Sequence, residues 1–219
     1  AVAKVSHDLR NILTSAQLFT DRLGLSEDPR VQRMAPKLVN SLTRAVHLCE
    51  STLAYGKAEE PQPTLARVRI ADIAADVIDS ERLSVGLAEV RFEADVPAEM
   101  MLRADAEQLY RVIANLVRNA RQAIVNTGQP GEVTVTAGED VRGWIIRVRD
   151  TGPGLPPKAR EHLFKPFQGG VTKGGTGLGL TIAAELVRGH GGDLTLENSD
   201  AHGTTFCITL PKGNLGDMP

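Results

Sequence analysis

The chain has 219 residues, enough for one large domain or two small ones with a substantial core. Its 25 lysine and arginine residues nearly balance 27 aspartate and glutamate residues, so charge gives no reason to expect binding to nucleic acid or to an anionic membrane. No apolar run approaches the roughly 18–20 residues of a membrane span, and no signal peptide is visible.

Two helices are predicted over residues 1–57. Apolar residues recur at steps of three and four from the start, at Val2, Val5, Leu9, Ile12, Ala16, Phe19 and Leu23. Because no capping residue precedes this series, we expect the helix to continue upstream and the chain to be a fragment. After a break at 24–29, a second helix with a broad apolar face reaches about Tyr55. One hairpin cannot bury that face, whereas two paired hairpins can, so we expect a homodimer.

A polar, proline-broken linker is predicted over 58–66, followed by a second domain at 67–211 and a tail at 212–219. Strands and helices are mixed in this domain without a repeating βαβ unit, which predicts an α+β sandwich with one sheet and helices on one face. Strands are expected near 67–70, 90–95, 101–103, 132–137, 144–150, 193–198 and 204–210. Helices are expected over about 71–84, over 105–126 with a start resembling a capping box, and from Gly175 to about Arg188.

Both cysteines are expected to be buried thiols. Cys49 lies in the apolar stripe of a predicted helix, and Cys207 lies in a predicted strand with alternating apolar residues. This use of cysteine fits a reducing compartment. We therefore expect the chain to be cytoplasmic, with membrane attachment only through segments upstream of it, if at all.

Two glycine-rich turns indicate a nucleotide site. The first follows an acid at the end of a predicted strand, and the second opens a predicted helix. Their members are Gly152 and Gly154 in the first turn, and Gly175, Gly177, Leu178 and Gly179 in the second. Glycine lets backbone N–H groups approach a phosphate, and a helix N-terminus adds a favourable dipole. Either turn alone fits an ordinary turn, and no P-loop motif occurs, but the pair favours a nucleotide.

Asp150 continues the core-facing row of a predicted strand, after Trp144, Ile146 and Val148. A carboxylate in such a row is costly unless it has a partner. Two interpretations stand: a cap for the following turn, or an acceptor for a buried ligand amine such as that of adenine. We favour the second interpretation.

Asn115 and Asn119 lie one turn apart on one flank of the helix predicted over 105–126. Asparagines at this spacing are usually only solvated. These two adjoin the edge of the apolar face, where they suit a cleft. Their carboxamide oxygens are ligands suited to a hard cation such as Mg²⁺, which also binds substrate phosphates.

His7 is predicted to be exposed, because it lies opposite the apolar seam of the first helix. Asp8 is its neighbour, and Asn11 follows one turn on. An exposed imidazole held by a carboxylate is a competent nucleophile, since the acid fixes its tautomer and balances positive charge. The remaining histidines have no such surroundings and receive no role: His47, His162, His190 and His202.

Taken together, these pieces resemble the sensor histidine kinases of two-component signalling, over nearly the whole chain. The matching motifs, in order, are Ser6-His7-Asp8-Leu9-Arg10-Asn11, Asn115-Leu116-Val117-Arg118-Asn119-Ala120, Asp150-Thr151-Gly152-Pro153-Gly154, Leu163-Phe164-Lys165-Pro166-Phe167, Gly175-Thr176-Gly177-Leu178-Gly179-Leu180 and Gly203-Thr204-Thr205-Phe206. They resemble the phosphoacceptor box, the N-box, the first glycine box, the F-box, the second glycine box and the closing strand motif. The resemblance implies a dimeric antiparallel helical hairpin forming a four-helix bundle, followed by an α/β sandwich that binds ATP (the GHKL type).

The resemblance also implies roles for single residues. Asn119 would hold Mg²⁺ on the triphosphate with support from Asn115, and Asp150 would recognise the adenine amine. Lys173, in a lid, would meet phosphate, and the glycines of the second box would bring the backbone close. His7 would be phosphorylated and would pass the phosphoryl group to an aspartate of a response regulator receiver domain. Asn11 would orient water for dephosphorylating that receiver.

The sequence departs from the family pattern at three positions. Ile12 stands where many members have proline, and Asp8 replaces the more frequent glutamate. Gln122 lies where a basic residue often contacts phosphate, so Arg118 or Arg121 would have to supply that charge.

We therefore predict ATP-dependent autophosphorylation on His7 and phosphoryl transfer to a response regulator. One alternative is a histidine phosphotransfer adaptor with a non-catalytic nucleotide domain, although such adaptors lose the asparagines and glycine boxes. Another is a conformational ATPase of the same superfamily, which would lack His7 on a dimerising hairpin. The interpretation of the second glycine-rich turn as part of a dinucleotide-binding domain is weaker still, since no strand directly precedes Gly175.

Overall fold

The structure is a computed structural model, and it describes residues 61–83, 89–141, 143–165 and 178–212. The helical hairpin predicted over 1–57, with Cys49, lies outside these residues. In the part that is described, no helix has the length and apolar content needed to cross a membrane. Cys207 is buried in a strand, as expected.

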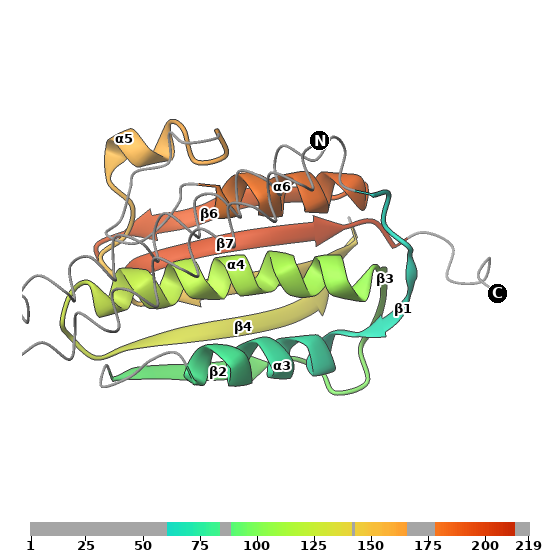
Figure 1. Cartoon of the computed structure of the whole chain (residues 1–219), viewed down its shortest axis with the longest axis horizontal. Helices are drawn as coiled ribbons and strands as arrows, with labels where there is room; N and C mark the ends of the chain where they lie inside the picture. The colour runs from blue at the N-terminus through green and yellow to red at the C-terminus, as the bar shows by residue number, and fades with distance from the viewer. Residues whose placement is uncertain (1–60, 84–88, 142, 166–177, 213–219) are drawn as a thin grey trace, which may run out of the picture.

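A mixed five-stranded sheet has the strand order β2-β4-β5-β7-β6 (Figure 1). Its strands are β2 (Val90–Asp95), β4 (Gly131–Glu139), β5 (Trp144–Asp150), β6 (Asp193–Asp200) and β7 (Gly203–Leu210). Strands β2 and β4 run parallel, and the other neighbours are antiparallel. Each of these strands was predicted, within a few residues at its ends.

The expectation of a single sheet is wrong, because β1 (Ala66–Arg69) and β3 (Met101–Ala104) pair only with each other. Strand β1 runs into helix α3 (Ile70–Arg82) without a loop, and only Asp105 separates β3 from helix α4 (Ala106–Val125). Both strands are therefore tied to the first turns of two neighbouring helices. They form a separate two-stranded ribbon at that end of the helical layer.

Helices α3, α4 and α6 (Gly179–Gly189) lie side by side over one face of the sheet, with α4 in the middle (Figure 1). Helix α6 begins at Gly179, later than predicted. A short helix, α5 (Pro157–Arg160), was not predicted. Its four residues are too few for a helical period, although proline at its start favours the first helical turn.

The core lies between α4 and the sheet. The predicted apolar face of α4 is confirmed, since each of its members is at most 5% exposed: Leu109, Val112, Ile113, Leu116, Val117, Ala120 and Ile124. On the sheet, Trp144, Ile146 and Val148 are buried in the same cluster. Burial on both sides fixes the rotation of α4 about its axis, because a large apolar side chain contributes about 1.5–3 kcal/mol when it leaves water. The flanks of α4 are thereby directed at α3 and α6.

Asp105 caps the first turn of α4, as its sequence position predicted. Its Oδ1 accepts a hydrogen bond from Gln108 N at 3.0 Å, and its Oδ2 accepts one from Thr64 N at 2.9 Å. The capping box is not closed by Gln108, whose amide donates to the carbonyl oxygen of Pro61 at 2.9 Å. Instead the Asp105 N–H donates to His190 Nε2. The chain entering this domain is thus hydrogen-bonded to the start of α4.

Candidate functional site

Asn115 and Asn119 lie on the flank of α4 that faces the start of α6. A Cβ atom placed on Gly179 would be 3.6 Å from Asn115 Oδ1 and 3.9 Å from Asn119 Nδ2. Both asparagines are half-buried. The first residue of α6, which belongs to the second glycine box, therefore lies directly beside both asparagines of the N-box.

The first glycine box lies against the same flank of α4, one turn further on. A Cβ atom on Gly152 would be 3.3 Å from Cβ of Ala123, which follows Asn119 by four residues. Asn115, Asn119 and Ala123 thus form one stripe along the helix. The turn after β5 and the start of α6 meet this stripe at its two ends.

Asp150 ends β5 with its side chain in the core, only 5% exposed. Its Oδ1 accepts a hydrogen bond from Gly152 N at 2.8 Å, and the backbone of Thr204 also donates to this carboxyl group. Burial raises the pKa of Asp150 to about 6, and the two backbone donors oppose the rise only in part. The prediction that Asp150 continues the buried row is confirmed.

Both interpretations of Asp150 remain compatible with this geometry. The hydrogen bond to Gly152 is the turn cap of the first interpretation. A carboxylate has about four acceptor positions, and two backbone donors leave the others for a ligand amine. The capping role and a recognition role can therefore belong to the same side chain.

Glycine is required around Asp150 by close backbone contacts. Gly203 has φ +138°, and a Cβ atom there would collide with the carbonyl oxygen of Asp150. Gly154 has φ +74°, and a Cβ atom there would collide with the carbonyl oxygen of Asp200. At Gly152, a Cβ would lie 2.8 Å from Asp150 Oδ1. These contacts hold the buried carboxyl group and its turn in place, and they explain the glycine at 154 without any ligand.

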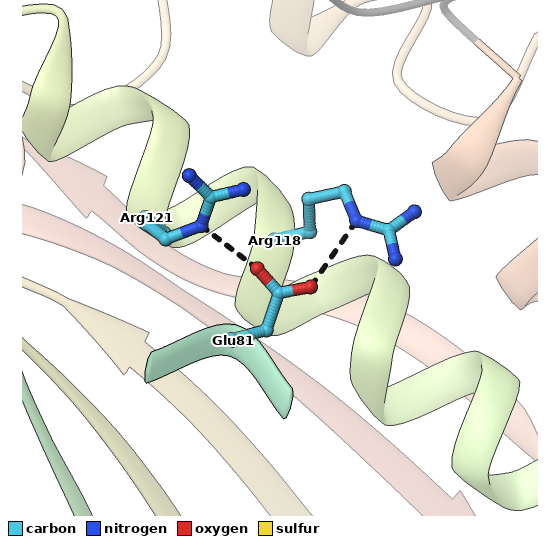
Figure 2. Close-up of polar contacts among 3 residues, drawn as sticks. All are labelled: Glu81, Arg118 and Arg121. Carbon is cyan, nitrogen blue, oxygen red and sulfur yellow. Dashed lines mark hydrogen bonds and ion pairs between the residues drawn. The ribbon is translucent and has the colours of Figure 1, made fainter. Parts of the chain in front are cut away.

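Glu81 is a charged residue of this region that the sequence analysis missed. Its side chain is 5% exposed and pairs with two arginines of α4: Oε1 lies 3.2 Å from Arg118 Nε, and Oε2 lies 2.7 Å from Arg121 Nε (Figure 2). A signal was present in the sequence. Glu81 continues the series of buried residues three and four apart on α3. In the same way, Asp150 continues the alternating buried row of β5.

The side chains along the α4 stripe suit a hard cation, because Asn115 and Asn119 carry carboxamide oxygens, and that of Asn115 lies beside Gly179. In the described ranges, no three His, Cys, Asp or Glu side chains cluster as a metal site. The other predicted site residues lie outside the described residues: His7, Asp8, Asn11, Lys173, Gly175 and Gly177. Leu178 is buried just before α6.

Two family profiles match the chain. The profile described as "Histidine kinase-, DNA gyrase B-, and HSP90-like ATPase" covers residues 104–214. The profile described as "His Kinase A (phospho-acceptor) domain" covers residues 1–61. The first match includes α4, both glycine boxes and the strands around Asp150.

Similar proteins include the probable sensor histidine kinase TcrY of Mycobacterium tuberculosis. It is 32% identical over 222 residues, which is 96% of this chain and 45% of TcrY. The chain therefore spans less than half of that relative. A similar solved structure is that of the histidine kinase ThkA in complex with the response regulator protein TrrA, with TM-score 0.68 and 26% identity, covering 96% of this chain and 60% of that one. Full-length ShkA, solved with AMPPNP, shares the fold with TM-score 0.73 at 24% identity, covering 96% of this chain and 45% of that one.

Proposed function

Since the chain belongs to the sensor histidine kinases of two-component signalling, we propose that it binds ATP with Mg²⁺ and autophosphorylates on His7. The phosphoryl group then passes to an aspartate of a response regulator. The observation that carries the proposal is the stripe on α4, where Asn115 and Asn119 adjoin Gly179 and Ala123 adjoins Gly152.

The order of groups along this stripe gives the nucleotide a direction. Asp150 lies at the end with Gly152 and would accept a hydrogen bond from the adenine amine. Gly179 lies at the other end, where the first backbone N–H groups of α6 suit phosphate. Asn115 and Ala123 are eight residues apart, which is about 12 Å along a helix and suits an extended nucleoside triphosphate.

Asn119 would hold Mg²⁺ on the phosphates, with Asn115 supporting it from the preceding turn. The cation supplies neutralisation of the charge on the transferring phosphoryl group. Lys173 and the backbone at Gly175 and Gly177 would contribute further phosphate contacts. Such a site works mainly by positioning the phosphates and neutralising their charge. The amides and the glycine backbone would position the phosphates, and the cation would neutralise the charge.

In the reaction proposed, an imidazole nitrogen of His7 forms a bond to the γ-phosphorus. The bond from that phosphorus to the bridging oxygen breaks, and ADP leaves. Asp8 would hold the ring in the reactive tautomer and balance its positive charge. The phosphoryl group would then move to a receiver aspartate, as the solved complex of ThkA with TrrA suggests by likeness.

Three further assignments belong to this proposal. The chain forms a homodimer through the hairpin of residues 1–57, in keeping with the phosphoacceptor-domain match to residues 1–61. It acts in the cytoplasm. Asn11, one turn after His7, orients water for dephosphorylating the response regulator.

Incubation with γ-labelled ATP tests the kinase proposal. We expect label on the chain that is lost in acid and kept in base, as for phosphohistidine. His7→Gln should abolish this label and leave the affinity for a non-hydrolysable ATP analogue unchanged. Label that persists in the variant would refute His7 as the acceptor, and a wild-type chain that binds no analogue would favour the adaptor.

Asn11→Ala separates the two activities proposed for this part of the chain. The variant should still label His7, while the phosphorylated response regulator should live longer in its presence. If labelling and dephosphorylation fall together, the water-orienting role of Asn11 is wrong.

A further inference from the structure

The two arginines that pair with Glu81 differ in how much of each side chain is exposed. Arg121 is only 16% exposed, whereas Arg118 is 50% exposed. Glu81 pairs with the Nε edge of Arg118, and Figure 2 shows the two terminal nitrogens of Arg118 directed away from that carboxylate. Among the residues that the structure describes, Arg118 is thus held at the Nε edge of its guanidinium group, and no partner is seen at the other edge.

Arg118 is also a charged residue adjacent to the candidate phosphate site. It precedes Asn119 directly and follows Asn115 by three residues, so it borders the stripe that faces Gly179. Position 122, one turn beyond Arg118, holds a neutral glutamine. Of the arginines of α4, Arg111 lies one turn before Asn115, at the outer end of the stripe, whereas Arg118 lies between the two asparagines in sequence.

We propose that Arg118 binds the terminal phosphates of ATP through its two Nη groups, and that Glu81 is the positioning residue that holds it for this role. The inference rests on the proposed function, since it assigns a further contact to the same site. A guanidinium group can engage a carboxylate and a phosphate at once, because its five N–H donors lie on different edges of one plane. Arg121, which is mostly buried against the other oxygen of Glu81, fixes the carboxylate and does not touch the nucleotide.

Binding of adenosine, ADP and a non-hydrolysable ATP analogue to the full chain tests this proposal. Arg118→Gln should weaken binding of the analogue by about tenfold or more, as expected for lost charge-assisted hydrogen bonds, and leave adenosine affinity unchanged. The salt dependence of analogue binding should also become shallower. Arg118→Lys should recover part of the loss, because an ammonium group keeps the charge and loses the two-edged geometry.

Further variants separate this role from a structural one. Glu81→Gln should reduce the ratio of analogue affinity to adenosine affinity, and Arg121→Gln should reduce it less, because Glu81 keeps its pairing with Arg118. Arg188→Gln removes the same charge from the far end of α6 and should leave that ratio unchanged. Equal losses for adenosine and the analogue in Arg118→Gln, or no loss, would overturn the proposal. A wild-type chain that binds none of these ligands would overturn the nucleotide site itself.

Discussion

The backbone N–H of Asp105 donates a hydrogen bond to Nε2 of His190 at 3.0 Å, which joins the first turn of α4 to the end of α6. The other ring nitrogen of His190 lies 2.8 Å from the carbonyl oxygen of Leu186. Since Nε2 accepts a hydrogen bond, Nδ1 is the ring nitrogen that donates to the carbonyl oxygen of Leu186. His190 is therefore a buried structural connector between two helices that both border the candidate site.

The first prediction follows from this connection. His190→Ala should destabilise the chain by about 2 kcal/mol, because the Asp105 N–H loses its partner and a cavity forms beside it. Urea denaturation measures the change. His202→Ala, at an exposed histidine, serves as the control and should leave stability unchanged. Equal stability of the His190 variant and the wild type would show that the bond contributes nothing.

The second prediction concerns the pH dependence of ligand binding at Asp150. With a pKa raised to about 6, the carboxylate is present above that pH and is protonated as the pH falls through it. Adenosine affinity should therefore fall between pH 7.5 and pH 5, and adenosine avoids titration of a ligand phosphate. Asp150→Asn should bind adenosine several-fold more weakly at pH 7.5 and show no such decline. A decline of the same size in the variant would assign the titration to another group.

The raised pKa of Asp150 also leads to a third prediction, which concerns the stability of the chain without ligand. The folded-state pKa of about 6 exceeds the ordinary value of 3.8, so the folded chain binds more protons than the unfolded one between these pH values. The stability contributed by Asp150 is thus lost as the pH rises through this window, by roughly 3 kcal/mol in total. Relative to wild type, Asp150→Asn should become more stable as the pH rises from 4 to 7. Parallel stability curves for the two proteins would contradict the raised pKa.

The fourth prediction separates binding from folding at the start of α6. A Cβ on Gly179 meets Asn115 at an ordinary contact distance of 3.6 Å, so Gly179→Ala should keep or raise the melting temperature. The added methyl group would stand between the asparagines and the backbone N–H groups of α6, and affinity for the ATP analogue should fall. Gly189→Ala, at the other end of the same helix, is the matched control and should leave affinity unchanged. Unchanged affinity in Gly179→Ala would place the phosphates elsewhere.

Much of the helical layer was predictable from the sequence because the interactions that encode it are local. The apolar face of α4 follows from residues three and four apart, and Asp105 caps a backbone N–H only three residues away. The buried row of β5 follows from alternation along a single strand. Such signals do not depend on where the rest of the chain lies, so the amino-acid pattern alone was enough to single out Asn115, Asn119 and Asp150.

Other features depend on which segments meet after folding. No local pattern places Gly179 beside Asn115, because that contact depends on how α6 packs against α4. The pairing of Glu81 with Arg118 and Arg121 likewise requires α3 to lie next to α4 in one rotation. The joining of β1 to β3 in a separate ribbon depends on the two helices that these strands enter.

Asp150 shows the physical reason for this division. Its place in a buried row, just ahead of a glycine turn, could be read from the order of residues, because strand alternation acts over close neighbours. Its pKa could not be predicted from the order of residues, because the pKa depends on the surroundings of the carboxyl group in the folded chain. Burial beneath α4, with donors from Gly152 and from Thr204 on the neighbouring strand, sets its pKa near 6, and desolvation is a property of all the atoms around a group, whatever their order in the chain.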